Sequence, residues 1–212
     1  MKRWSPLAVF CLIVWICAVA QSQTKTTLVP IDSPDVHPQY FPKGAFSDSL
    51  KDSDFEARWY SKHLRVMAEP SLLTASKDGT LIVFRFLWLR TFHYPIAIRM
   101  TVRPDGTASI TAKVTSGHGG YEPGRVVQRK SVEIPKTTVA HFFDLLQSAS
   151  FWSLRNDAEI GGNDGAQWIL EGLQNGTYRV IVRWSPKDGD YRTACLYLLE
   201  LSGIKVQAKD IY

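Results

Sequence analysis

The sequence contains little cysteine, no long apolar run and no strong excess of one charge. Its 212 residues include 3 cysteines and carry a formal net charge of +5. No apolar run reaches the roughly 18 residues that a membrane-spanning helix needs. Hydrophobic residues make up 45% of the chain and charged residues 21%, which argues against a wholly disordered chain, a collagen or a coiled coil. A single globular domain of ordinary size is the expected organisation.

The first twenty residues have the pattern of an export signal. Lys2 and Arg3 precede the uncharged stretch 7–20, which ends in small residues suited to signal peptidase. We expect cleavage before Gln21, with an uncleaved anchor as the alternative, and a periplasmic or extracellular location. The mature chain then has no transmembrane segment. Without Lys2 and Arg3 the net charge falls from +5 to +3, which is too mild to indicate a nucleic-acid-binding protein.

Cleavage also removes two of the three cysteines, Cys11 and Cys17. Cys195 remains as a lone thiol on the apolar side of a predicted helix, where we expect it to be buried and inert. No intrachain disulfide is then possible, so an exported domain of this kind must be stabilised by its hydrophobic core.

Residues 21–52 are rich in proline and poor in large aliphatic residues. Prolines recur at four-residue spacing at Pro30, Pro34, Pro38 and Pro42. Because proline fixes φ and removes a backbone donor, neither a helix nor a central strand is expected. We predict a flexible tether over 21–52; a peptide-like ligand for some groove is the alternative.

Residues 53–206 show the periodicities of a single α+β domain, followed by a tail at 207–212. Period-2 alternation and turn residues predict a meander of four antiparallel strands, and Asn175-Gly176 marks a C-terminal hairpin. Apolar stripes at helical spacing predict three helices. We therefore predict an antiparallel sheet of about six strands with three helices packed mainly on one face. The predicted strands lie near 83–92, 96–102, 108–114, 125–134 and on both sides of 175–176, and the helices near 55–67, 135–146 and 190–202.

The glycine-rich segment Gly117–Gly124 is the first candidate site. Glycines allow a backbone to approach a ligand closely and to turn several N–H groups one way. His118, Tyr121 and Glu122 are its candidate ligand-binding side chains. The segment does not match a dinucleotide fingerprint, and the chain has no nucleophile elbow, so a plain connection between strands is the alternative.

Two further loops contain candidate ligand-binding residues. Asp164 lies in a polar glycine-rich loop, where its carboxylate suits a cation or a sugar hydroxyl and equally suits an Asx turn. Trp184 and Asp188 follow the predicted hairpin. An exposed Trp184 suits stacking on a sugar ring, whereas a buried one is an ordinary core residue.

Glu171 is a carboxylate on an otherwise apolar face of the hairpin, so it must be paired or have a raised pKa. Arg90 is placed similarly among aromatic residues. We predict that Glu171 and Arg90 form a buried ion pair. The alternative is a general acid, which needs a second carboxylate and a cleft. The histidines are scattered without zinc-ligand spacing, so we predict neither a metal site nor a cofactor.

Several long segments of the domain, taken in order along the chain, resemble a group of bacterial secreted or periplasmic proteins of unknown function. The resemblance covers roughly residues 55–204 and implies a bacterial source and an envelope or extracellular location, with no activity or catalytic residue attached to it. The segments that carry the resemblance include FRFLWLRTFHYP at 84–95, TSGHGGYEPG at 115–124, GAQWILEG at 165–172 and RWSPKDG at 183–189.

The sequence therefore favours an exported, non-catalytic module that binds a protein or a cell-envelope ligand. The alternative is a hydrolase of cell-wall or glycan material that uses Glu171 or Asp164 with His118. Convergence of these three side chains in one cleft would favour the hydrolase, and their separation would favour the binding module.

Overall fold

The computed structural model describes residues 38–46, 54–156, 162 and 164–212. The predicted signal at 1–20 and the tether residues 21–37 and 47–52 lie outside this part. The helices are α1 (Phe55–Val66), α2 (Leu72–Ala75), α3 (Lys136–Ser148), α4 (Asp190–Ser202) and the 3-10 helix η1 (Ala208–Asp210). The strands are β1 (Ile82–Arg90), β2 (Ile96–Val102), β3 (Ala108–Thr115), β4 (Val126–Ile134), β5 (Ala166–Gln174) and β6 (Thr177–Trp184).

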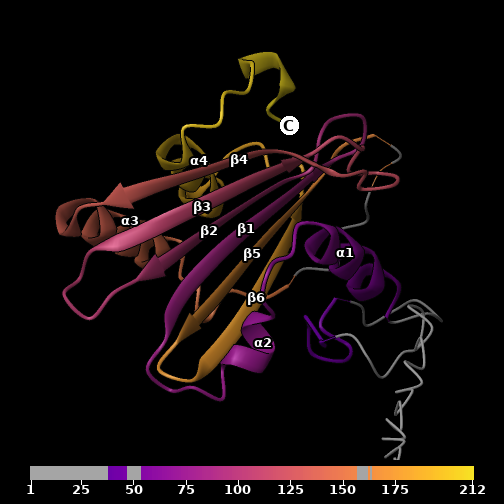
Figure 1. Cartoon of the computed structure of the whole chain (residues 1–212). Helices are drawn as coiled ribbons and strands as arrows, with labels where there is room; N and C mark the ends of the chain where they lie inside the picture. The colour runs from indigo at the N-terminus through magenta and orange to yellow at the C-terminus, as the bar shows by residue number, and fades with distance from the viewer. Residues whose placement is uncertain (1–37, 47–53, 157–161, 163) are drawn as a thin grey trace, which may run out of the picture. The chain divides into compact units, whose positions relative to one another are not determined.

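The strands form one antiparallel sheet in the order β4-β3-β2-β1-β5-β6 (Figure 1). The meander β1 to β4 and the hairpin β5–β6 therefore meet at β1, which confirms the predicted α+β fold. Asn175 and Gly176 both have positive φ, 51° and 73°, as a type I′ turn requires. This turn sets the register, in which Gln174 lies opposite Thr177.

Helices α3 and α4 cover one face of the sheet, which we call the α3–α4 face. Phe84, Phe86 and Trp88 alternate along β1 and are fully buried in this core. The predicted helical stripes face the same core because 3.6-residue periodicity keeps them on one side of each helix. These stripes are Val139, Phe142 and Leu146 on α3, and Tyr191, Cys195, Leu198 and Leu199 on α4.

Helix α1 lies on the opposite face, which we call the α1 face (Figure 1). Its buried Tyr60 and Leu64 share a cluster with Leu87 and Leu89 of β1. The prediction of helices packed mainly on one face therefore holds for α3 and α4, while α1 packs against the other side. Strand β1 is buried on both faces as a result, and all its residues after Ile82 are buried.

Residues 38–46 also pack on the α1 face, so the predicted tether is wrong for this stretch. Tyr40 and Phe41 are each 3% exposed. The Tyr40 hydroxyl donates to the Glu69 carbonyl at 2.8 Å, and Ser71 Oγ donates to the Gln39 carbonyl at 2.5 Å. The prolines prevent regular secondary structure here, and burial of the Tyr40 and Phe41 rings holds the segment on the sheet instead.

The predicted tail at 207–212 belongs to the domain as well. Trp168 Nε1 donates to the Tyr212 carbonyl at 2.8 Å, and the Tyr212 hydroxyl lies 2.8 Å from His93 Nδ1. Ile211 and Tyr212 pack against the core of the α3–α4 face. Among the residues that the structure describes, no helix is long and apolar enough to cross a bilayer.

Candidate functional site

Three of the predicted loops meet at one end of the sheet, which we call the loop end. Thr91, just after β1, connects the first two through backbone hydrogen bonds, and Ser185 connects the third. Gly120 N donates to Thr91 O at 3.2 Å, and Thr91 N donates to Gly165 O at 2.9 Å. Ser185 N then donates to Ala166 O at 2.8 Å. The described parts of segments 117–124, 161–164 and 185–190 are therefore neighbours at the loop end.

The glycines of the first loop serve chain packing rather than ligand binding. Gly119 N lies 3.0 Å from both Arg90 O and His93 O, so it donates within the domain. A Cβ atom on Gly119 would lie 2.5 Å from the backbone of Leu89 and Arg90. Only glycine permits this approach. The expectation that these N–H groups point together at a ligand is wrong, because Gly117, His118 and Gly120 also donate to carbonyls nearby.

Large aromatic side chains are exposed at the loop end. Phe92 is 53%, Tyr94 51% and Tyr121 60% exposed. The Phe92 and Tyr121 ring centroids lie 6.5 Å apart, and His118 lies 6.4 Å from both Tyr94 and Tyr121. We call Phe92, Tyr94, His118 and Tyr121 the aromatic patch. The sequence singled out His118 and Tyr121, whereas it assigned Phe92 to the strand, which in fact ends at Arg90.

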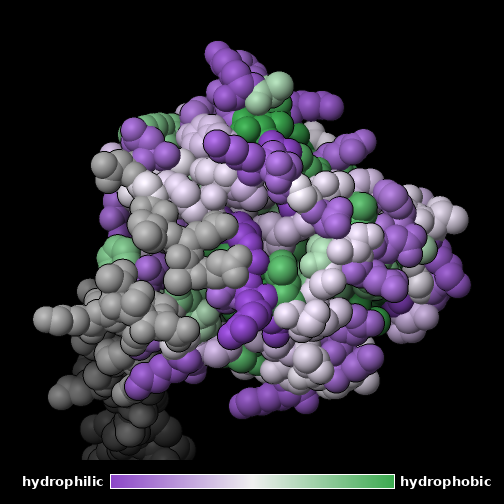
Figure 2. All heavy atoms as spheres, turned by 180° about the vertical axis from the view of Figure 1, so that it is seen from behind, coloured by the Kyte–Doolittle hydropathy of each residue, from purple (hydrophilic) through white to green (hydrophobic). Residues whose placement is uncertain are grey.

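The surface seen from behind differs from this patch. Among the described residues seen in Figure 2, the hydrophobic ones form small groups between hydrophilic ones. Scattered apolar residues of this kind are normal on protein surfaces. A group of exposed aromatic rings on adjoining turns is the more informative feature.

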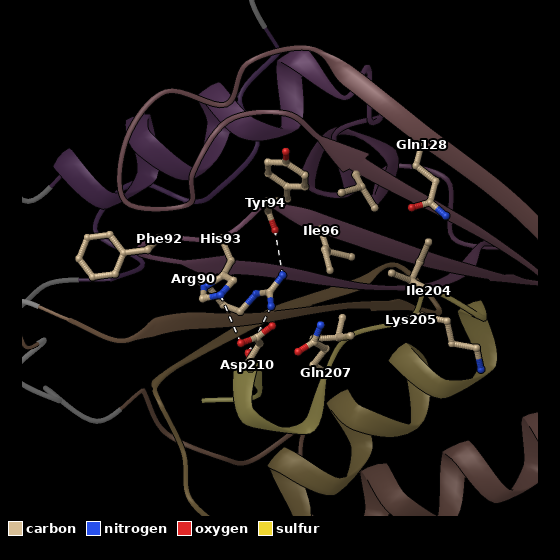
Figure 3. Close-up of a pocket in the computed structure, with 12 residues that line it drawn as sticks. Arg90, Phe92, His93, Tyr94, Ile96, Gln128, Ile204, Lys205, Gln207 and Asp210 are labelled. Atoms are coloured by element: carbon tan, nitrogen blue, oxygen red, sulfur yellow. Dashed lines mark hydrogen bonds and ion pairs between the residues drawn. The ribbon is translucent and has the colours of Figure 1, made fainter.

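A hollow of about 400 Å³ adjoins the aromatic patch (Figure 3). It lies between the turn after β1, the adjoining parts of β2, β3 and β4, and the residues that follow α4. We call it the Arg90 hollow. Four of its lining residues are aliphatic, namely Ile96, Val114, Ile204 and Val206.

Arg90 is 4% exposed and has no ion pair with a carboxylate in the described part of the chain. Its guanidinium carbon lies 4.3 Å from the Trp88 ring centroid. Nη1 donates to the Asp210 carbonyl at 3.2 Å and Nη2 to the Tyr94 carbonyl at 3.3 Å. Burial lowers the pKa of Arg90, and the charges of Tyr212 and Asp210 oppose this shift.

The predicted pair of Glu171 with Arg90 is therefore wrong, and Glu171 instead pairs with Arg85. Arg85 lies directly opposite Glu171 in the register of β1 and β5. Its Nε donates to Glu171 Oε2 at 2.6 Å and its Nη2 to Oε1 at 2.8 Å. Arg90 is five positions further along β1, so alternation places it on the other face. Burial raises the pKa of the Glu171 carboxyl, while Arg85 opposes that rise.

Arg85 and Glu171 belong to a larger cluster on the α1 face, which we call the ion network. It also contains Glu69, Arg99 and Lys113. Glu69 lies 2.8 Å from Arg99 Nε, 2.6 Å from Lys113 Nζ and 3.8 Å from Arg85 Nη1. The sequence missed Arg99 and Lys113 because it assigned their side of the meander to solvent. In the fold, the chain that leaves α1 covers them.

The three residues of the hydrolase hypothesis do not meet. His118 and Asp164 are exposed at the loop end, whereas Glu171 is fully buried in the ion network. Glu171 is five residues into β5 from Ala166, which corresponds to about 17 Å along the strand. An acid and base pair acting at one point is therefore not formed by these side chains.

The other candidate residues differ in their surroundings. Glu122 is exposed and pairs with Lys62 of α1. Trp184 is half-buried, and its indole packs where a Cβ on Gly165 would be, 2.4 Å from Trp184 Cζ2. Asp188 is exposed ahead of α4. Within the described ranges, no three His, Cys, Asp or Glu side chains lie together in a way that would hold a metal ion.

Cys195 is fully buried on α4, as expected from its place in the apolar stripe. Burial raises the pKa of its thiol, so the reactive thiolate is disfavoured. This cysteine therefore contributes to the core rather than to a site.

The comparisons with known proteins do not identify a relative. No protein-family model matches the chain, and no curated protein shows significant sequence similarity to it. The geometry of the loop end is therefore the basis for assigning a function.

Proposed function

We propose that this protein is an exported, non-catalytic binding domain that recognises a protein or a cell-envelope component through the aromatic patch. The observation that carries the proposal is the exposure of Phe92, Tyr94 and Tyr121, each more than half accessible. Export is proposed from the signal-like pattern of residues 1–20.

Exposed aromatic rings are well suited to recognition. A large aromatic side chain buries about 150–250 Å² and loses little conformational freedom when it is immobilised. The turns that carry these rings are already held by the backbone bonds around Thr91 and Gly119. A preorganised surface loses less entropy on binding, so more of the contact energy is expressed as affinity.

The positions of the carboxylates also favour a binding domain over a hydrolase. Glu69 and Glu171, the buried acidic residues of the described chain, pair with Arg85, Arg99 and Lys113. Asp164 is exposed and lies away from Glu171, so these two residues do not form the pair of carboxylates that glycoside hydrolysis generally requires.

The test of the patch uses a photo-crosslinking amino acid in place of Tyr121, with Phe55 as the matched position. Phe55 is also an exposed aromatic residue, 55% accessible, but lies on α1. We expect a discrete adduct with envelope material at position 121 and none at 55. Unlabelled protein should compete for the adduct, and the F92A/Y94A/Y121A variant should not.

Equal adducts at both positions would contradict the patch as a specific surface. Release of soluble fragments from purified cell walls by the native protein would favour the hydrolase instead. Export is tested separately by mass spectrometry of the exported chain, whose first residue should be Gln21.

A further inference from the structure

We propose that the Arg90 hollow binds an organic carboxylate that has a small apolar body. This inference deepens the proposed function and rests on it, because Phe92 and Tyr94 belong to both the aromatic patch and the hollow. It names the chemistry of a ligand at the loop end.

The charge of Arg90 is not balanced by a carboxylate of the described chain. A buried charge is costly unless it is paired, and Arg90 is 4% exposed without a carboxylate partner in the described residues. A guanidinium has five N–H donors. Arg90 uses two of them on the carbonyls of Tyr94 and Asp210, at 3.3 and 3.2 Å, and its Nε is buried without an acceptor. The terminal nitrogens therefore retain donor capacity.

The carboxylate of the nearby Asp210 faces His93. The Asp210 carboxylate lies 3.5 Å from His93 Nε2 rather than on the guanidinium. In Figure 3, the terminal nitrogens of Arg90 point toward the side of the hollow where Ile96 and Gln207 stand. An anion on that side completes the pairing that Asp210 leaves open.

Three polar side chains without hydrogen bonds in the described chain also line the hollow. Gln128, Lys205 and Gln207 line the hollow. Within the described chain, their side chains make none of the hydrogen bonds or ion pairs of the domain. An ammonium group and two amides are good donors to a carboxylate.

The apolar lining and the charge balance narrow the ligand class. Ile96, Val114, Ile204 and Val206 suit an aliphatic or aromatic body, and about 400 Å³ suits a small one. A planar carboxylate matches the guanidinium fork. The nearby Asp210 carboxylate makes a second negative charge on the ligand unfavourable, so a monoanion fits better than a phosphate dianion. Both a free acid and the C-terminal residue of another chain have this chemistry.

The experiment is a calorimetric titration of the full chain with 3-phenylpropionate and with its uncharged amide. We expect the acid to bind at least tenfold more tightly than the amide. Lys205→Gln should weaken acid binding a few-fold, whereas Lys187→Gln, an exposed lysine outside the hollow, should leave it unchanged. Equal binding of acid and amide, or no binding of the acid at millimolar concentration, would overturn the proposal.

Two variants test the site itself. Arg90→Met should abolish acid binding, and Val206→Trp should do so by filling the hollow, which keeps the test decisive if Arg90→Met does not fold. Acid binding that survives in a folded Arg90→Met or Val206→Trp protein would refute the proposal. A tetrapeptide ending in phenylalanine, with a free or an amidated terminus, separates the two sources. Tighter binding of the free peptide than of 3-phenylpropionate assigns the site to a partner chain's end, and the reverse assigns it to a small acid.

Failure here is distinguishable from failure of the proposed function. Tyr121 does not line the hollow, so the adduct at position 121 and the binding of the acid report on different places. Crosslinking at position 121 without acid binding would refute the hollow alone. Acid binding without crosslinking would refute the patch alone.

Discussion

Arg85 and Arg90 lie on the same strand, five residues apart, yet their charges are balanced in different ways. Arg85, on the α1 face, is fully buried and forms two hydrogen bonds with the Glu171 carboxylate. Arg90, on the α3–α4 face, is nearly as buried but donates to two carbonyls at longer distances. One guanidinium completes a closed cluster, and the other borders an open hollow.

The charge of Arg85 stabilises the fold, whereas the charge of Arg90 is available for binding. Arg85 and Glu171 are both fully buried, so removing either one leaves the other charge buried without its counter-ion. Arg90 has no such carboxylate partner in the described chain, so its removal leaves no orphaned anion there. Burial alone therefore does not tell whether a charged residue stabilises the fold.

The largest effect is expected where the closed cluster is broken. Glu171→Gln keeps the shape of the side chain but removes the charge that balances Arg85. We expect the free energy of unfolding to fall by about 3–5 kcal/mol. Urea denaturation measures this change, and Glu200→Gln on the exposed side of α4 is the control. Unchanged stability of Glu171→Gln would show that the ion network is not structural.

Gly119→Ala tests the packing that holds the loop end beside Arg90. The added Cβ would lie 2.5 Å from backbone atoms, so the loop must shift. We expect a loss of about 1–3 kcal/mol in thermal unfolding, together with loss of crosslinking at position 121. Gly79→Ala is the matched control, since no atom lies within 4 Å of a Cβ there. Normal crosslinking in Gly119→Ala would mean that the loop position does not matter for binding.

His63 gives the α1 side a pH dependence. Both ring nitrogens are buried without hydrogen-bond partners in the described residues. Burial, aided by Lys62 and opposed by Glu122, lowers the pKa of His63 from 6.5 to about 4. The unfolded chain therefore binds a proton more tightly, so this stability is complete above pH 6.5 and is lost as the pH falls toward 4.

The expected loss from His63 between pH 7 and pH 5 is about 2 kcal/mol. It should appear as the difference in unfolding free energy between the native protein and His63→Leu measured at both values. His141→Leu, on the exposed side of α3, serves as the control. The same pH dependence in His63→Leu as in the native protein would exclude His63 as its source.

The smallest effect is expected at Arg90. Arg90→Met removes a buried charge that lacks a carboxylate partner and retains apolar volume over Trp88. We expect the unfolding free energy to change by less than about 1 kcal/mol, against at least about 3 kcal/mol for Arg85→Met. Differential scanning calorimetry of the two variants makes the comparison directly. Equal losses would abolish the distinction between the two arginines.

Local patterns predicted most of the elements of this fold. Alternation along 96–102 and 108–114 gave strands with nearly the observed bounds. The Asn175-Gly176 turn predicted the pairing of the last two strands correctly, because a two-residue turn leaves a single register. The apolar stripe and Gly203 predicted the last helix, and Gly203 does have a left-handed φ of 65°.

The partner of Glu171 required information that local patterns do not contain. Whether Arg85 or Arg90 faces Glu171 depends on the register of β1 with β5, two strands far apart in the chain. The polar side of the meander was assigned to solvent for the same reason. Only the path of the chain after α1 brings Met67 and Glu69 onto Lys113 and Arg99.

The sequence predicted two of the four residues of the aromatic patch. His118 and Tyr121 stood out because glycines surround them. Phe92 and Tyr94 did not, since they continue an aromatic run whose earlier members, Phe86 and Trp88, are core residues. The strand ends between these two groups, and strand ends are poorly defined by alternation.

The pairing of β1 with β5 has a consequence for the nascent chain. Arg85 and Glu171 are 86 positions apart, so the central strand has one unpaired edge and an unbalanced charge until most of the protein has been synthesised. Contacts this distant in sequence form late, because closing the intervening loop costs entropy first. We expect the growing chain to remain unfolded for much of its translation, which is the state that a translocation channel threads across a membrane.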